Sequence, residues 1–341
     1  MVKITDVAAH AGVSPSTVSY ALSGKRPISA ETRQRIERSI RELGYTPHAG
    51  ARSLASSRAQ VLALVLPLRK GIHVPVVMQF ATSVVTAARA HDHDVLLLTQ
   101  SEGEEGLLRV ARSAMADAFV LMDVELEDRR LPLLRSLDRP SVLIGFPADP
   151  TGLTCIDLDF HRAGEACVEH LAELGHRRVA LVGSPPEVYA RDTGFARRVA
   201  DGFREAADRA GLPSSVWPCA DTSVAARALA ERLVREQPDL TGIVVHNEPI
   251  VQPLIEALVA QGLRVPQDVS VTAICPDEIA EQAPIPVTSV SIPSAEVGAG
   301  AVELLMAKLR GQAVPESTLL PVRLTARAST APPPTARPAH G

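Results

Sequence analysis

The sequence ITDVAAHAGVSPSTVSYAL, from Ile4 to Leu22, predicts two short helices joined by a tight turn. Thr5 can cap the first helix, and Gly12 can adopt the left-handed conformation that ends it. Ser14 can cap the second helix, and Pro15 suits its first turn, where no backbone N–H donor is required. This spacing is typical of a helix-turn-helix.

The second predicted helix has an apolar side and a polar side. Val18 and Leu22 are four residues apart, so we expect both to be buried on one side, near the small Ala8. The other side carries hydroxyl groups that suit hydrogen bonding in a DNA major groove. These polar residues are Ser16, Thr17, Ser19 and Tyr20.

A third helix is predicted after Ser29 and ends at Gly44. Ile36, Ile40 and Leu43 share one face of it and can close a three-helix core. A small bundle that only covers the rest of the protein is the alternative interpretation of these three helices.

Charge is distributed unevenly along the 341 residues. Residues 1–60 contain nine Lys and Arg against four Asp and Glu, a balance of +5. The chain has 35 basic and 39 acidic residues, so the remainder holds 26 and 35, a balance of −9. This asymmetry predicts a head that binds a polyanion and an acidic body, although a solvated basic face is the alternative.

The segment YTPHAGARSLASSR, which begins at Tyr45, predicts a short helix that is marginal on its own. Pro47 can open it, but residues 49–55 make barely two turns and include Gly50. Leu54 lies between Arg52 and Arg58 with no evident core, which suits a wedge in a DNA minor groove. A flexible linker with an incidental leucine is the alternative.

From Val61 onward, short apolar runs alternate with amphipathic stretches such as 164–174 and 250–262. Runs that are apolar on both faces are typical of parallel strands covered by helices. The clearest are ALVLP, DVLLLT, AFVLM, SVLIGF, RVALVG, GIVVH and VSVTAI. About ten such strands exceed one compact sheet, so we predict an α/β body with two lobes of doubly wound parallel sheet.

The predicted organisation is therefore a helix-turn-helix domain at 1–46, a hinge at 47–58, a two-lobed body at 61–328 and a disordered proline-rich tail at 329–341. The four cysteines have no CxxC or Cys/His metal spacing, so we predict reduced structural thiols, no metal and no cofactor. The apolar runs are too short to cross a bilayer, and MVKITDVAAHAG has no signal-peptide core. We therefore expect a cytoplasmic, nucleoid-associated protein with no membrane partner.

These residues together resemble the LacI/GalR family of bacterial transcription regulators. The resemblance is dense over about 57 residues: KITDVAAHAGVSPSTVSYALSG, ETRQRI, ELGYTP and ARSLAS. It continues, less tightly, through DLDFHRAGEACVEHLAELGHRRVALVG, ADGFREAADRAGL, RVPQDVSV and PVTSVSIPSAEVGAGAVELLMAKLRG. It implies two doubly wound lobes similar to periplasmic sugar-binding proteins, a small-molecule effector between them, and a homodimer on a palindromic double-stranded DNA operator, with a tetramer as the alternative assembly.

The resemblance also implies which residues contact DNA. Ser16 and Tyr20 would meet base edges, with Pro15 packing nearby, while Thr17 and Ser19 would meet phosphates. Lys25 and Arg26 would lie on the flanking DNA, and Leu54 would be the hinge wedge. Thr5 and Ala51 complete the predicted set. Gly50 replaces a β-branched residue that is common in the family, which implies a weaker hinge helix.

The expected effector pocket departs from the family pattern. Asn247 is retained, but the acid beside it is Glu248, one methylene longer. Cys275 and Pro276 occupy the positions of the usual acids, and Asp277 follows one step late. Val199 stands where an effector-binding arginine is common, so its neighbours become candidates. The full predicted set is His73, Phe146, Tyr189, Arg191, Arg198, Asn247, Glu248 and Asp277.

The alternative to effector binding is a structural role, either loop capping or ion pairing between the lobes, for Asn247, Glu248, Arg191 and Asp277. Aromatic rings that could stack on a sugar are scarce, with six Phe, three Tyr and one Trp in the chain. A sugar or related metabolite is nevertheless the effector that the resemblance implies.

Two other function classes compete with a regulator, which we take to be a repressor. An α/β enzyme fused to a helical head would need a catalytic constellation, but the sequence contains no P-loop, GxSxG, HExxH or GxGxxG motif in the required context. An exported solute-binding protein would explain two lobes but requires a signal peptide. The sequence therefore predicts that the protein is not an enzyme and regulates transcription from an operator.

Overall fold

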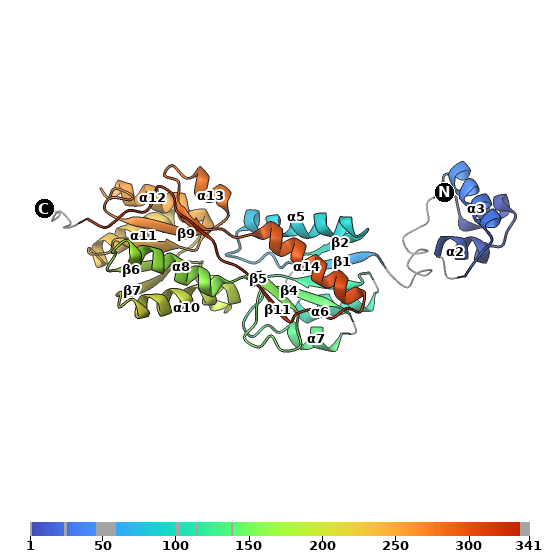
Figure 1. The fold of residues 1–341 in the computed structure, drawn as a ribbon, viewed down its shortest axis with the longest axis horizontal. Helices are drawn as coiled ribbons and strands as arrows, with labels where there is room; N and C mark the ends of the chain where they lie inside the picture. Colours follow the sequence, from blue (N-terminus) through green and yellow to red (C-terminus); the bar gives the residue numbers. More distant parts are fainter. Residues whose placement is uncertain are drawn as a thin grey trace.

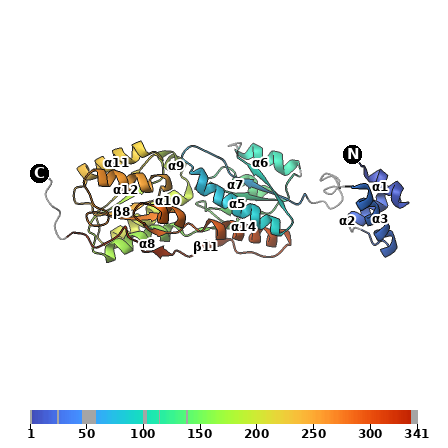
Figure 2. The same cartoon turned by 90° about the horizontal axis from the view of Figure 1, so that it is seen from above.

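The computed structural model describes residues 2–45 without 24 and 25, and residues 59–334 without 100–102, 114 and 138. The hinge predicted at 47–58 lies outside the described residues, as do Lys25, Ala51 and Leu54. Figures 1 and 2 show a small helical bundle and a larger body built from two α/β lobes.

The head contains α1 (Ile4–Ala11), α2 (Pro15–Ser23) and α3 (Ala30–Leu43). The predicted turn is confirmed, because Gly12 ends α1 with a φ of 65° and the Ser14 hydroxyl accepts the Thr17 N–H at 3.1 Å. Ser29 caps α3 in the same way through the Thr32 N–H, and Gly44 ends it at a φ of 61°. Local capping chemistry thus sets the limits of these helices.

The core of the head is small and apolar, and two predictions about it are wrong. Its buried side chains are Val7, Ala8, Ala11, Val18, Ile36 and Tyr45. Leu22 is 39% exposed, because Ala21 is the neighbour that packs on this core. Thr5 does not cap α1: the helix begins at Ile4, and the Asp6 carboxylate accepts the Lys3 N–H at 2.8 Å instead.

The first lobe of the body is a six-stranded sheet in the order β11-β5-β4-β3-β1-β2, with every pair parallel. Its strands are β1 (Val61–Val65), β2 (Asp94–Leu98), β3 (Ala118–Leu121), β4 (Ser141–Ile144), β5 (Cys155–Leu158) and β11 (Ser317–Leu320). Its helices are α5 (Val74–Ala90), α6 (Gly103–Arg112), α7 (Leu131–Ser136) and α14 (Ser294–Leu309).

The second lobe repeats this arrangement in the order β12-β10-β9-β8-β6-β7, in which only the β10–β12 pair is antiparallel. Its strands are β6 (Val179–Gly183), β7 (Ser214–Pro218), β8 (Gly242–Val245), β9 (Ser270–Ile274), β10 (Thr288–Val290) and β12 (Leu324–Thr325). Its helices are α8 (Phe160–Glu173), α9 (Pro186–Ala190), α10 (Gly194–Arg209), α11 (Ser223–Glu236), η1 (Glu248–Ile250), α12 (Val251–Ala260) and α13 (Asp277–Gln282).

The chain crosses between the lobes three times. It leaves the first lobe after β5, returns after β10 through α14, and crosses again between β11 and β12. Figures 1 and 2 both show α14 alongside α5, although α14 follows β10 of the second lobe in sequence. The predicted doubly wound, two-lobed architecture is confirmed.

Glycine allows an unusually close contact between α8 and α10. A Cβ at Gly202 would lie 2.0 Å from the backbone carbonyl oxygen of His161, and one at Gly164 would lie 2.4 Å from that of Val199. The two helices therefore pack backbone against backbone over the second sheet. Val199, the residue at the expected arginine position, is fully buried in this contact and in the core below it.

Two further expectations about the body need correction. The DVLLLT run forms β2, but this strand lies at the edge of its sheet, and Leu97 is 39% exposed. The tail does not begin at 329, because Ser329 is fully buried: its hydroxyl donates to the Val271 carbonyl at 2.5 Å and accepts the Thr288 N–H at 2.8 Å. Residues 329–331 complete the second lobe by pairing with β9.

Candidate functional site

Hydroxyl groups cover the N-terminal half of α2. The Ser14 Oγ lies 2.8 Å from both the Ser16 Oγ and the Thr17 Oγ1, so the cap residue also orients its neighbours. Ser16 is exposed, and Thr17, Ser19 and Tyr20 are partly exposed. The predicted polar face of α2 is therefore present. On the opposite side of this helix, the buried Val18 packs into the core of the head.

Two arginines contact the C-terminal half of α2. The Arg26 guanidinium lies over the Tyr20 ring, 5.4 Å from its centroid, which is a cation–π arrangement. Arg33 of α3 donates to the Ala21 carbonyl at 3.3 Å. Sequence spacing did not reveal the Arg26–Tyr20 pair, because Arg26 lies beyond the end of α2 at Ser23. It places a positive charge directly beside a residue of the polar face.

A second site lies between the lobes, where the carboxyl ends of the two sheets face each other. Residues that follow β1, β3, β4, β6, β7, β8 and β10 line it, together with the end of β5. In open α/β sheets this edge is the usual ligand site. The space between these walls is about 960 Å³ when the open solvent at its mouth is included.

Acidic side chains from both lobes line this cleft. Asp123 and Asp157 come from the first lobe, and Asp221 and Glu248 from the second. Burial raises the pKa of Asp157 to about 7, although the Leu158 N–H donates to its Oδ1 at 2.9 Å. Burial likewise raises the pKa of Glu248 to about 7. The pKa of Asp123 is also raised by burial, against the opposing charge of nearby Arg69.

Two histidines and three phenylalanines, His73, His246, Phe80, Phe160 and Phe195, also line the cleft. His246, only 2% exposed, packs with its ring centroid 5.7 Å from Phe160 and 5.6 Å from Phe195. Burial lowers the pKa of His246 to about 4 and also lowers that of His73. The Nδ1 atoms of both histidines are buried with no hydrogen-bond partner in the described part of the chain. Both rings are therefore neutral and available to a ligand.

The structure brings three of the eight predicted effector residues to the cleft wall: His73, Asn247 and Glu248. The Asn247 side-chain amide is already engaged, because its Nδ2 donates to the carbonyls of Gly183 at 3.2 Å and Cys219 at 2.7 Å. Asn247 therefore ties together the loops after β6, β7 and β8, which fits the loop-capping alternative.

The other five predicted residues lie outside the described lining of the cleft. Arg198 lies over the Phe146 ring at 4.7 Å, and Asp277 pairs with Arg327 at 2.8 Å. The Tyr189 hydroxyl is buried without a partner. Arg191 donates to the Lys70 carbonyl at 3.0 Å, and its Nε and Nη2 have no partner among the described residues.

Four ionisable lining residues were missed from the sequence: Asp123, Asp157, Asp221 and His246. The sequence contained a signal for three of them, because His246 directly follows β8, while Asp123 and Asp221 lie just after β3 and β7. Asp157 interrupts the buried strand CIDL, and a carboxylate inside such a strand is itself unusual.

Hydrogen bonds join the lobes beside the cleft. The Leu126 N–H donates to the Asp192 carbonyl at 2.8 Å, and the Gly194 N–H donates to the Val124 carbonyl at 2.9 Å. These two bonds, with the contact between Arg191 and Lys70, hold the two walls together on one side.

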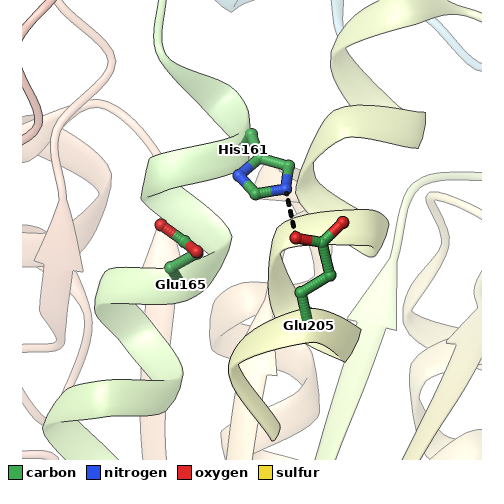
Figure 3. Close-up of side chains that lie close together, drawn as sticks. All are labelled: His161, Glu165 and Glu205. Carbon is green, nitrogen blue, oxygen red and sulfur yellow. Dashed lines mark ion pairs between the residues drawn. The ribbon is translucent and has the colours of Figure 1, made fainter. Parts of the chain in front are cut away.

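A separate cluster on the second lobe consists of His161 and Glu165 of α8 and Glu205 of α10 (Figure 3). Their nearest ligand atoms all lie within 4.8 Å of one another, and the His161 Nε2 is 3.3 Å from a Glu205 oxygen. Glu165 also pairs with Arg209 at 2.8 Å and with Arg162 at 3.4 Å. Because two guanidinium groups already balance Glu165, we interpret the cluster as an ion-pair network that joins α8 to α10.

No helix in the described part of the chain is long and apolar enough to span a membrane.

Comparisons with known proteins account for both parts of the chain. Residues 3–48 match the family model for bacterial regulatory proteins of the lacI family, and residues 168–330 match a periplasmic binding protein-like domain. The HTH-type transcriptional regulator CelR of Thermobifida fusca is 30% identical over 330 residues, which cover 93% of this chain and 93% of that protein.

Solved structures agree with this match. A transcriptional regulator CelR–cellobiose complex superposes with a TM-score of 0.68 at 26% identity, covering 96% of this chain and 100% of that one. The Lac repressor dimer bound to operator and an anti-inducer superposes with a TM-score of 0.82 at 24% identity, covering 97% and 99%, and supports the fold. The chain thus belongs to the lacI family of bacterial regulatory proteins, and it is a DNA-binding regulator of transcription.

Proposed function

We propose that the chain binds a palindromic DNA operator as a homodimer and represses transcription under the control of a small molecule held between the lobes. The observation that carries this proposal is the exposed hydroxyl face of α2, fixed from behind by Val18 and by the Ser14 cap. A rigid helix with hydrogen-bonding side chains on one face is the geometry that reads base edges in a major groove.

The individual roles on this face are proposed from the family resemblance. Ser16 and Tyr20 would contact base edges, whereas Thr17 and Ser19 would contact phosphates. Arg26 is held beside Tyr20 and supplies positive charge for the DNA backbone. The roles assigned to Thr5, Pro15, Lys25, Ala51 and Leu54 remain proposals drawn from the family resemblance.

A face of α5 supports the proposed dimer. Val74, Met78 and Val85 are 45%, 38% and 42% exposed, and at 100° per residue they fall within about 40° of one another around the helix. An apolar stripe on an exposed helix suits burial against a second copy. We propose that this α5 face belongs to the dimer interface.

The cleft is the proposed effector site. It lies at the carboxyl ends of both sheets, and a solved relative is a complex with cellobiose. An effector that contacts both lobes shifts the equilibrium between two arrangements of the lobes. The size of this shift is set by the difference between its affinities for the two arrangements. We propose that this change in the bodies alters the spacing of the two heads, and hence operator affinity.

The alternatives considered from the sequence are a solute-binding protein and an enzyme with an added head. The match to CelR spans head and body together, which favours the regulator over both. We propose that the protein acts in the cytoplasm, on the nucleoid, without enzymatic activity.

Gel shifts of the full chain on operator-length duplexes, combined with light scattering, test the proposal. We expect two chains per bound duplex and a steep loss of affinity with salt, because Lys and Arg release counterions from phosphate. Met78→Glu should break the dimer and weaken operator binding, whereas Val259→Glu, at an apolar position on α12 that is 51% exposed, should do neither. A chain that binds no palindrome better than random duplex would contradict the proposal.

A further inference from the structure

The charge of the cleft indicates the chemistry of the effector, and this inference rests on the proposed function. The described lining contains four carboxyl groups, on Asp123, Asp157, Asp221 and Glu248, and neither Lys nor Arg. The acids come in equal number from both lobes. A closed cleft therefore gathers negative charge from two sides.

Within the described ranges, three of these carboxyl groups have no basic side chain at ion-pair distance: those of Asp157, Asp221 and Glu248. Asp123 lies 3.3 Å from an Arg69 nitrogen, and Asp221 is exposed to solvent. Asp157 is only 6% exposed, and the Leu158 N–H is the hydrogen-bond donor found on it in the structure. The charge of Arg198 lowers the pKa of Asp157 against the larger effect of burial, but the Arg198 guanidinium lies over the Phe146 ring.

The remaining polar groups of the cleft favour the same kind of ligand. His246 is almost fully buried, lines the cavity and has an Nδ1 without a partner among the described residues. A neutral imidazole does not repel a cation and can accept a hydrogen bond from one. Phe80, Phe160 and Phe195 add aromatic rings to the lining, and ring faces attract cations.

We propose that the effector carries a positively charged nitrogen on a compact, partly apolar body, and that Asp157 of the first lobe and Glu248 of the second hold this charge. The walls of the cleft repel each other when both carboxylates are ionised and the site is empty. A bound cation neutralises both walls at once, so it draws the lobes together and stabilises the closed cleft.

Two other ligand classes fit the lining less well. A neutral polyol can hydrogen-bond to the carboxylates, but it leaves their charge unbalanced in a mostly apolar cavity. A hydrated divalent ion is suited to oxygen ligands, yet much of this wall consists of Phe, Val, Ile and Met side chains. An organic cation uses both the acidic and the apolar parts.

Binding of matched probe pairs to the full chain tests the proposal. Thermal shift and calorimetry at about pH 8, where both carboxyl groups are ionised, compare benzylammonium with benzyl alcohol and choline with 3,3-dimethylbutanol at constant ionic strength. We expect the cationic member of a pair to bind and to raise the Tm above that in equal sodium chloride. Asp157→Asn or Glu248→Gln should weaken it by roughly 10- to 100-fold, the value of a charged hydrogen bond.

Glu231→Gln, an exposed change on α11 of the same lobe, should leave probe binding unaltered. The proposal is overturned if neither cation exceeds sodium chloride, if the neutral partners bind as well as the cations, if the two cleft variants respond like wild type, or if Ca²⁺ alone produces the shift. Operator binding by the unliganded chain is measured separately. A failure there contradicts the proposed function, whereas the outcomes above contradict only the charge of the ligand.

Discussion

Asp157→Asn should make the protein more stable above pH 7 and leave it nearly unchanged near pH 4. Burial raises the pKa of Asp157 from 3.8 to about 7. An acid with a raised pKa in the folded state keeps its proton longer there than in the unfolded chain. The contribution of Asp157 to stability is therefore most favourable below pH 4, falls as the pH rises from about 4 to about 7, and is then constant.

The structure sets the size of this effect. A difference of about three pKa units at about 1.4 kcal/mol each gives an upper limit of about 4 kcal/mol. Asparagine cannot ionise, and its Oδ1 can still accept the Leu158 N–H. Its amide brings an extra donor into a buried site, so we expect a net gain of about 2 kcal/mol at pH 8. For a lobe of this size that is a Tm increase of roughly 4–8 °C.

Urea unfolding of wild type and variant at a series of pH values measures the effect. The gain should grow between pH 4 and 7 and then level off. Asp208→Asn, an exposed change on α10, should show no such trend. A variant whose stability difference from wild type is the same at pH 4 and pH 8 would refute the claim that this carboxyl group is buried without a counter-charge.

Three further predictions concern packing, the C-terminal segment and the head. Gly202→Ala should lower the free energy of unfolding in urea by about 3 kcal/mol or more, because the new Cβ would lie 2.0 Å from the His161 carbonyl oxygen. A loss below about 1 kcal/mol would show that α8 and α10 can separate freely. Truncation after residue 328 should destabilise the protein by about 3 kcal/mol, because the hydrogen bonds of Ser329 are lost, whereas truncation after residue 334 should not. Equal stability of the two truncated proteins would place residues 329–334 outside the fold. Tyr20→Ala should change which half-site is preferred on a panel of operator variants, whereas Lys3→Ala should weaken all of them about equally; a uniform loss for Tyr20→Ala would remove it from the base-reading set.

Local chemistry made much of this structure predictable. The limits of α2 and α3 follow from Ser14, Ser29 and Gly44, because a cap acts within four residues of itself. Apolar runs likewise located most of the strands. The exposure of Leu22 was not predictable, since only the packed bundle shows that Ala21 takes the inward position.

The cleft was harder to predict because its walls come from separate lobes. Asp157 and Glu248 are 91 positions apart, as their numbers show, and nothing in the spacing of their neighbours relates them. Asn247 was recognised by resemblance, yet its amide holds loops together. Ser329 lay in a sequence typical of a tail, but its buried hydroxyl and the hydrogen bonds of residues 329–331 to β9 attach this segment to the second lobe.

Recovery of duplexes from a random pool by the purified full chain tests the central claim, sequence-specific operator binding, most directly. A dimer that presents two α2 helices should enrich a palindrome whose half-sites repeat at about one helical turn. The enriched duplex should then bind at least about 10³-fold more tightly than random DNA at moderate salt. A pool that shows no common sequence after repeated rounds, while the chain still binds DNA, would contradict the account.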